Sequence, residues 1–88
     1  MLKISFVELA SRSVVLRLEG QVAGPWVEEL RTSCERFLTE GRQVTLDLTY
    51  VSFVDHNGIV LFRALAGHWV GLTNCSPFVV ELLKEEPL

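Results

Sequence analysis

The chain lacks the residue patterns that bind metals, nucleotides or other cofactors. Its two cysteines, Cys34 and Cys75, stand far apart without a CxxC or CxxH spacing, and His56 and His68 form no H-x-x-x-H pair. Such spacings are what zinc and other metal sites usually require. No GxGxxG sequence or Walker loop occurs either, so nucleotide binding has no support. We therefore expect no metal and no cofactor, and we interpret both cysteines as reduced thiols.

An excess of charge of one sign and long hydrophobic runs are also lacking. Eight basic and 11 acidic residues give a net charge of -3 with no basic cluster, which argues against a nucleic-acid partner. The longest apolar run, residues 58–62, ends at Arg63 and is far shorter than the roughly 20 residues that span a bilayer. Lys3 and Glu8 interrupt any signal-like stretch at the N-terminus. We expect no membrane insertion and a cytoplasmic location.

What the chain does contain is the pattern of one small α/β domain. Its 88 residues are 49% hydrophobic, enough for a single core, so we predict one domain over residues 1–88. Alternating apolar residues in 2–9 and 14–18, with a polar turn between them, predict a β-hairpin. Gly24-Pro25 then begins a helix that Gly41 ends. Its apolar positions recur every three or four residues: Trp26, Val27, Leu30, Cys34, Phe37 and Leu38.

The second part of the chain alternates strands and helices. A strand over 43–49 is followed by a turn that ends at Asp55, a good helix N-cap. Residues 57–66 then form a helix in which Arg63 is the only charge, and we give burial and a partner surface even weight for its apolar residues. A strand over 69–74 and a helix starting at Ser76-Pro77 complete the order β-β-α-β-α-β-α. We predict a mixed four-stranded sheet with about three helices packed on it.

The element order and one motif resemble the STAS domain family, whose members include the anti-sigma factor antagonists. The motif is Leu46-Asp47-Leu48-Thr49-x-Val51-x-Phe53-x-Asp55-x-x-Gly58, and the resemblance extends over nearly the whole chain. In regulatory members of the family, a serine or threonine follows the motif aspartate and is phosphorylated by a partner kinase. His56 stands at that position here and Asn57 at the next, and neither can take a phosphoester. The resemblance therefore implies a STAS-like domain without the serine switch.

The resemblance also implies a non-catalytic protein-interaction module, with a contact surface around the start of the second helix. The expected contact residues are Asp55, His56, Asn57, Gly58, Val60, Leu61 and Arg63. The partner would be an anti-sigma factor or kinase-like ATPase. Alternatively, the chain would be a cytoplasmic subunit of a lipid-transporting ABC complex, bound to its ATPase or permease. A homodimer also stays open.

An enzyme or ligand sensor that uses Asp47, Asp55 and His56 is the third hypothesis. Histidine can act as a general base and can titrate near neutral pH. However, no serine or cysteine nucleophile has an evident reason to approach His56. We therefore expect a non-enzyme in which His56 is an exposed or contact residue. We also expect Trp69 to pack against the protein, because one aromatic residue without basic neighbours makes no nucleotide platform.

Overall fold

Strands and helices follow one another in the predicted order. The structure is a computed structural model that describes residues 1–10 and 12–85. Its elements are β1 (Leu2–Ala10), β2 (Ser13–Val22), α1 (Pro25–Thr39), β3 (Gln43–Val54), α2 (His56–Ala66), β4 (Gly71–Thr73) and α3 (Pro77–Glu85). None of the helices in the described part of the chain is long and apolar enough to cross a membrane.

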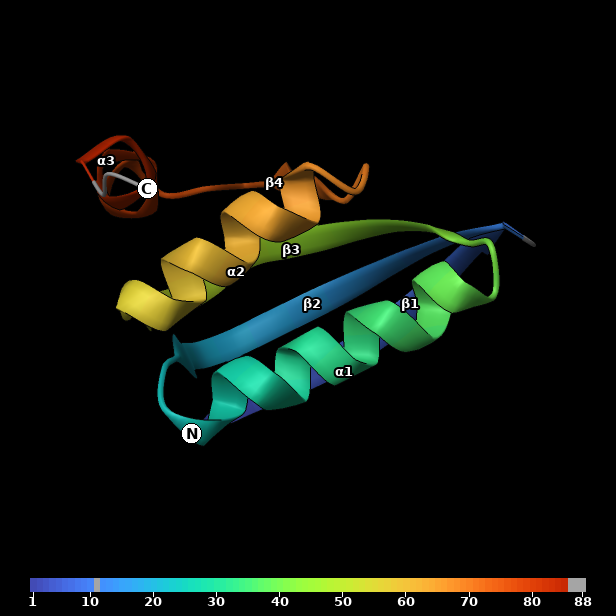
Figure 1. The fold of residues 1–88 in the computed structure, drawn as a ribbon, viewed down its shortest axis with the longest axis horizontal. Coiled ribbons are helices and arrows are strands. Elements are labelled where there is room, and N and C mark those ends of the chain that lie inside the picture. The colour runs from blue at the N-terminus through green and yellow to red at the C-terminus, as the bar shows by residue number, and fades with distance from the viewer. Residues whose placement is uncertain (11, 86–88) are drawn as a thin grey trace.

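The sheet is mixed, and its strands lie in the order β1-β2-β3-β4. The hairpin strands β1 and β2 are antiparallel, whereas β2, β3 and β4 run parallel to one another. Helices α1 and α2 are the two crossovers, and both move in the same direction across the sheet. Because such connections are right-handed in nearly all proteins, both helices fall on the same face of the sheet. Figure 1 shows them side by side there, and α3 lies on the opposite side of the molecule from α1.

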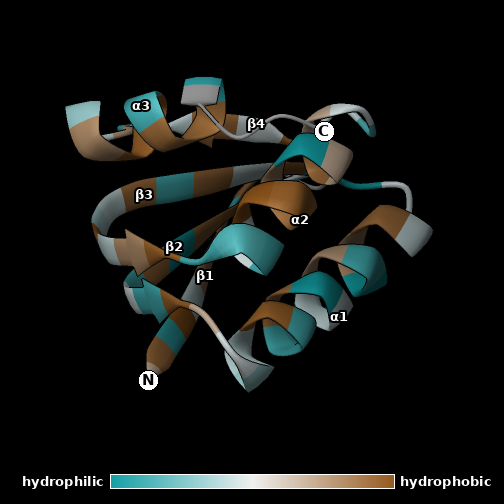
Figure 2. Ribbon diagram, turned by 60° about the vertical axis from the view of Figure 1, so that its left-hand side comes forward, coloured by the Kyte–Doolittle hydropathy of each residue, from teal (hydrophilic) through white to brown (hydrophobic). Residues whose placement is uncertain are grey.

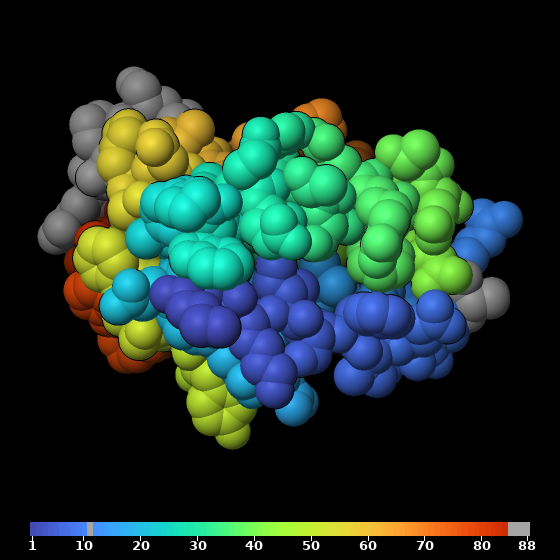
Figure 3. Space-filling view, turned by 90° about the horizontal axis from the view of Figure 1, so that it is seen from below, coloured from blue at the N-terminus to red at the C-terminus, as the bar shows by residue number. Residues whose placement is uncertain are grey.

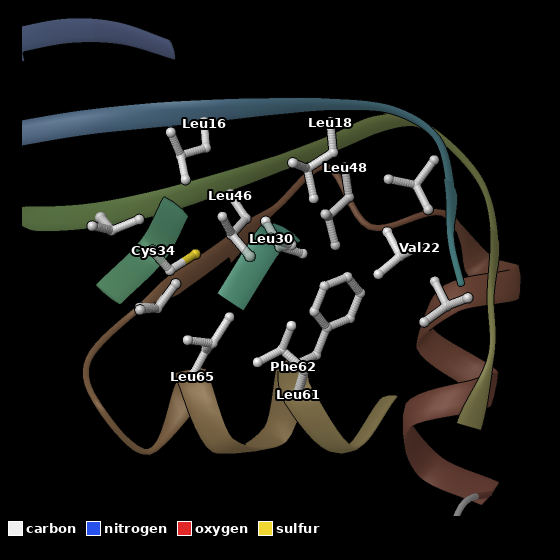
Figure 4. Packing of buried hydrophobic residues seen from close by; sticks show 14 of the residues in the cluster. Leu16, Leu18, Val22, Leu30, Cys34, Leu46, Leu48, Leu61, Phe62 and Leu65 are labelled. Carbon is white, nitrogen blue, oxygen red and sulfur yellow. The ribbon is translucent and has the colours of Figure 1, made fainter. Parts of the chain in front are cut away.

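The hydrophobic core lies between this face of the sheet and the two helices. Leu16 and Leu18 of β2 point toward the helices with Leu46 and Leu48 of β3, and Phe62 of α2 reaches up to meet them (Figure 4). The predicted stripe of α1 is confirmed: Leu30, Cys34 and Phe37 are buried, and Trp26, Val27 and Leu38 pack against the core. Burial of this apolar surface, at about 25 cal/mol per Å², is the main force that holds the helices to the sheet.

Three strands, β2, β3 and β4, differ in length from the prediction. β3 continues five residues beyond Thr49, because β2 is also longer and pairs Glu19–Val22 with this extension. Register shifts in the pairing are bulges that break the alternation of the side chains, so Leu48, Val51 and Val54 are buried at a spacing of three. β4 is shorter than predicted. Trp69 precedes it in the left-handed conformation, with φ of 68°, and is 88% exposed. The expectation that Trp69 packs was wrong.

Candidate interaction surface

Asp55 connects the start of α2 to the start of α1. One carboxylate oxygen, Oδ1, accepts the backbone N–H of Gly58 at 2.8 Å, which is the predicted N-cap bond. The other oxygen, Oδ2, accepts the backbone N–H of Gly24 at 2.9 Å, just before α1 begins. The two loops meet because β2 and β3 are parallel neighbours that end at the same edge of the sheet. Both oxygens of Asp55 are therefore used within the protein.

Gly58 allows α2 to approach the ends of β2 and β3 closely. A Cβ atom at this position would lie 2.7 Å from the carbonyl oxygen of Val22 and 2.7 Å from Cγ1 of Val54. Real Cβ atoms do not come that close to other heavy atoms, so any side chain would push the helix away from the sheet. Gly58 itself is buried. The motif glycine is thus a packing residue, and it lies beneath the surface on which we had expected it.

His56 and Asn57, between these two structural residues, are exposed on the first turn of α2. Val60 and Ala64 continue the exposed side of the helix at spacings of three and four, and Val60 is 42% exposed. We call these four residues the α2 outer strip. In Figure 2 the first turn of α2 is hydrophilic and the middle of the helix is hydrophobic. The strip therefore offers two polar side chains next to an apolar one.

Two further residues of the expected contact surface, Leu61 and Arg63, make contacts within the protein. Leu61 is buried in the core with Ile59, Phe62 and Leu65. Arg63 is partly buried, and its guanidinium donates a hydrogen bond to the backbone carbonyl of Leu83 in α3. That contact satisfies a carbonyl near the end of α3 and ties the two helices together. We had given burial and a surface position even weight for the apolar residues of α2. One side of the helix is buried in the core, and the other side is exposed to solvent.

Three aromatic residues near the carboxyl ends of the strands are exposed, which had not been predicted. Tyr50 and Phe53 lie on the extension of β3, and Phe78 lies in the first turn of α3. We had interpreted residues 50–54 as a turn, which hid the fact that two aromatic side chains point away from the core there. The apolar spacing of three through Leu48, Val51 and Val54 is the signal that could have revealed them. Exposed aromatic residues often mark protein contacts.

Asp47 does not join Asp55 and His56. Its Oδ1 accepts hydrogen bonds from the backbone N–H of Thr49 at 3.0 Å, the Thr49 hydroxyl at 2.6 Å and the Asn74 amide at 3.1 Å. These bonds, with Thr49 the largest influence, lower the pKa of Asp47 from 3.8 to about 2. Seven residues of β3, roughly 20 Å, separate Asp47 from Val54 at the end of the strand. Asp47 therefore does not share a site with Asp55 and His56, as the third hypothesis had required.

Neither cysteine supplies a nucleophile for this surface. Both are free thiols. Cys34 is buried on the sheet side of α1, and burial raises its pKa to about 12. Burial also raises the pKa of Cys75. Since the thiolate is the reactive form of cysteine, these raised pKa values disfavour reaction at either side chain.

Several solved structures share the fold of this chain. The anti-sigma factor antagonist SpoIIAA in its unphosphorylated form superposes with a TM-score of 0.77 at 20% sequence identity, over 97% of this chain and 84% of SpoIIAA. The Bacillus cell fate determinant SpoIIAA in its phosphorylated form gives 0.72 at 20% identity, over 93% and 81% of the two chains. The chain has the SpoIIAA-like fold. An uncharacterised Shewanella loihica protein with this fold gives 0.59 at 12% identity, over 88% and 69%.

This likeness confirms the predicted architecture: a mixed four-stranded sheet with three helices in the order β-β-α-β-α-β-α. No protein-family model matches the chain, and no curated protein is similar to it at a significant level. At 20% identity the superposition establishes the fold alone. The likeness therefore assigns no role to the α2 outer strip.

Proposed function

We propose that this chain is a non-catalytic interaction module of the anti-sigma factor antagonist type, and that it binds a protein partner through the α2 outer strip. One observation supports this most strongly. The Asp55 carboxylate accepts two backbone hydrogen bonds and Gly58 is buried against two strands, whereas His56, Asn57 and Val60 are exposed to solvent. A mixed polar and apolar strip of this kind, rigidly held at a capped helix start, is suited to protein recognition.

The proposal includes the absence of the serine switch. A phosphoserine adds nearly two negative charges, and at a docking surface it changes the affinity for a partner by electrostatics and desolvation. His56 and Asn57 have no hydroxyl group to accept a phosphoester. Binding through this surface is therefore not released by serine or threonine phosphorylation at these two positions.

A permanent subunit of a transport complex is the second candidate. The exposed apolar side chain of Val60, beside two residues that cannot be phosphorylated as serine is, suits a contact that does not cycle. In this case the partner is the ATPase or the permease of a lipid-transporting ABC complex. Both candidates use the same strip and the same cytoplasmic setting, and they differ in the partner.

The first experiment uses the tagged chain to capture partners from its native lysate, with identification by mass spectrometry. Recovery of an anti-sigma factor or kinase-like ATPase supports the antagonist, and recovery of a transporter ATPase with its permease supports the subunit. We expect Val60→Asp to reduce that recovery at least about tenfold, as loss of a central apolar contact does. Val7→Asp is the matched control, since Val7 is 50% exposed on the far strand β1. If both variants recover the partner like the wild type, the strip is not the contact.

A second experiment tests the missing switch with the recovered kinase-like partner. The native chain should show no phosphoserine or phosphothreonine at residues 56 and 57 after incubation with the kinase and ATP. His56→Ser should become a substrate and should then bind the partner more weakly, whereas His56→Ala should do neither. Phosphorylation-dependent release of the native chain through these positions would contradict the proposal.

A further inference from the structure

The outer side of β1 is a free sheet edge. β1 pairs with β2 along its length, and no other strand among the described residues pairs with its far side. The carbonyl of Met1 accepts the N–H of Gln21 at 3.2 Å, so the odd-numbered residues direct their backbone groups toward β2. In an antiparallel pair these directions alternate. Leu2, Ile4 and Phe6 therefore turn their N–H and C=O groups outward, to the solvent.

A cavity of about 270 Å³ opens beside this edge, between β1 and α1. Its β1 side is apolar, formed by Leu2, Ile4 and Phe6, whereas its α1 side is mixed, formed by Trp26, Glu29, Ser33, Arg36 and Phe37. Figure 3 looks at this side of the molecule: the blue atoms of β1 run along it below the green atoms of α1. Phe6 is 53% exposed although its ring contacts that of Phe37, with centroids 5.5 Å apart. The edge and the cavity share the same residues of β1.

We propose that a second copy of this chain docks here, by antiparallel pairing of the two β1 strands. Such an edge and cavity accept an extended segment that carries apolar side chains at alternate positions and outward backbone groups at those same positions. β1 is itself such a segment, because Leu2, Ile4 and Phe6 have apolar side chains and also direct their backbone groups outward. A two-fold axis makes the contact self-complementary, as symmetric dimers require.

The cavity also sets the register of the pairing. Leu2, Ile4 and Phe6 line it, so the residue opposite Ile4 is directed toward its middle. The largest apolar side chain that β1 offers on this face is Phe6. Placing the partner subunit's Phe6 opposite Ile4 puts Ser5 on the two-fold axis, and each phenyl ring turns from its contact with Phe37 toward the other copy's cavity. Ile4 and Phe6 both have outward backbone groups, so this register also forms hydrogen bonds.

Charge favours the antiparallel over the parallel arrangement. Lys3 and Glu8 stand near opposite ends of β1; Lys3 lies 3.9 Å from Glu19, and Glu8 accepts a hydrogen bond from Arg42 at 2.7 Å. In the proposed register Lys3 lies opposite the partner subunit's Val7 and Glu8 lies opposite the partner subunit's Leu2, so like charges stay apart, whereas in-register parallel pairing would bring them together. The α2 outer strip lies away from this edge, because α2 packs over β3 and not over β1. The dimer therefore stands apart from the proposed function and can form whether or not the latter holds.

Sedimentation over a concentration series tests the dimer. We expect a monomer–dimer equilibrium for the wild type, and at least about a tenfold rise in the dissociation constant for Phe6→Glu. Phe78→Glu is the matched control, since Phe78 is 51% exposed on α3, and it should associate like the wild type. Thermal unfolding of each variant verifies that it is folded. A wild type that stays monomeric, or equal weakening by the two variants, would overturn the proposal.

Disulfide trapping tests the register without any loss of apolar contact. Ser5→Cys, in a Cys75→Ser background, places two thiols across a non-hydrogen-bonded pair whose Cα atoms are about 4.5 Å apart, within the range of a disulfide. We expect a covalent dimer after mild oxidation. Val7→Cys is the control, because it lies roughly 13 Å from the partner subunit's equivalent residue. Equal trapping of both variants, or none for Ser5→Cys, would reject this register.

Discussion

The residues around the start of α2, at positions 55–60, form two sets: one faces the interior of the protein and the other faces solvent. Asp55 and Gly58 face inward: one accepts two backbone N–H groups and the other permits close packing. His56, Asn57 and Val60 face outward. The inward set alone explains why this motif specifies the fold. The outward set lies outside the core, and the architecture is intact with a histidine at residue 56.

The strongest test of the inward set is Gly58→Ala. The new methyl group would meet a backbone oxygen, which cannot move aside as a flexible side chain can. We expect the free energy of unfolding to fall by about 2–3 kcal/mol, despite the higher helix propensity of alanine. Chemical denaturation measures this loss. Gly71→Ala is the control, because its nearest contact, Thr45 Oγ1, lies at an ordinary 3.5 Å. An unchanged stability for Gly58→Ala would show that α2 does not need this close approach.

Asp55→Ala should have the next largest effect. It removes the N-cap of α2, typically worth about 1 kcal/mol, and also the acceptor for Gly24. Together we expect a loss of about 2 kcal/mol. Ser76→Ala is a built-in comparison, because the Ser76 hydroxyl caps α3 through a single bond to the Val79 N–H at 3.2 Å. Equal losses of stability in the two variants would mean that the hydrogen bond from the Gly24 N–H to Asp55 contributes nothing to stability.

Asp47 is the other carboxylate of the motif, and its effect on stability depends on pH. Its pKa in the folded chain is about 2, below the ordinary 3.8, so its stabilising contribution is complete above that ordinary value. Acidification through the folded pKa removes it. We expect Asp47→Asn to cost about 1 kcal/mol at neutral pH, and the difference from the wild type to shrink between pH 3.8 and about 2. Denaturation series at several pH values measure this, and a difference independent of pH would contradict it.

Local signals in the sequence were enough for the element order and for the helix starts. The proline at the start of α1, the Asp55 cap and the Ser76-Pro77 pair each act within one turn, so the residues alone reveal them. The length of β3 was not accessible in this way. It depends on bulges in the pairing with β2, which involve residues some 30 positions away. The same long-range pairing turns Tyr50 and Phe53 outward, so these two aromatic residues were missed.

The orientation of α2 was the other property that the sequence left open. Nearly all of its side chains are apolar, so periodicity does not distinguish the core side from the open side. The contacts that decide it are tertiary: Gly58 lies against the ends of two strands, and Arg63 reaches α3. Leu61 and Val60, adjacent and chemically alike, consequently have opposite surroundings. We had placed both on the contact surface, whereas Leu61 lies in the core and Val60 is exposed.

Val60→Asp should have the smallest effect on stability and the largest on binding. Val60 is exposed, valine and aspartate have similar helix propensities, and a negative charge near a helix N-terminus is favourable. We therefore expect the free energy of unfolding to change by less than about 0.5 kcal/mol. The same variant should lose the partner captured by the wild type, since an aspartate cannot be buried in an apolar contact without cost. A variant that unfolds would show that Val60 belongs with the inward set, and the division between the two sets would then have to be redrawn.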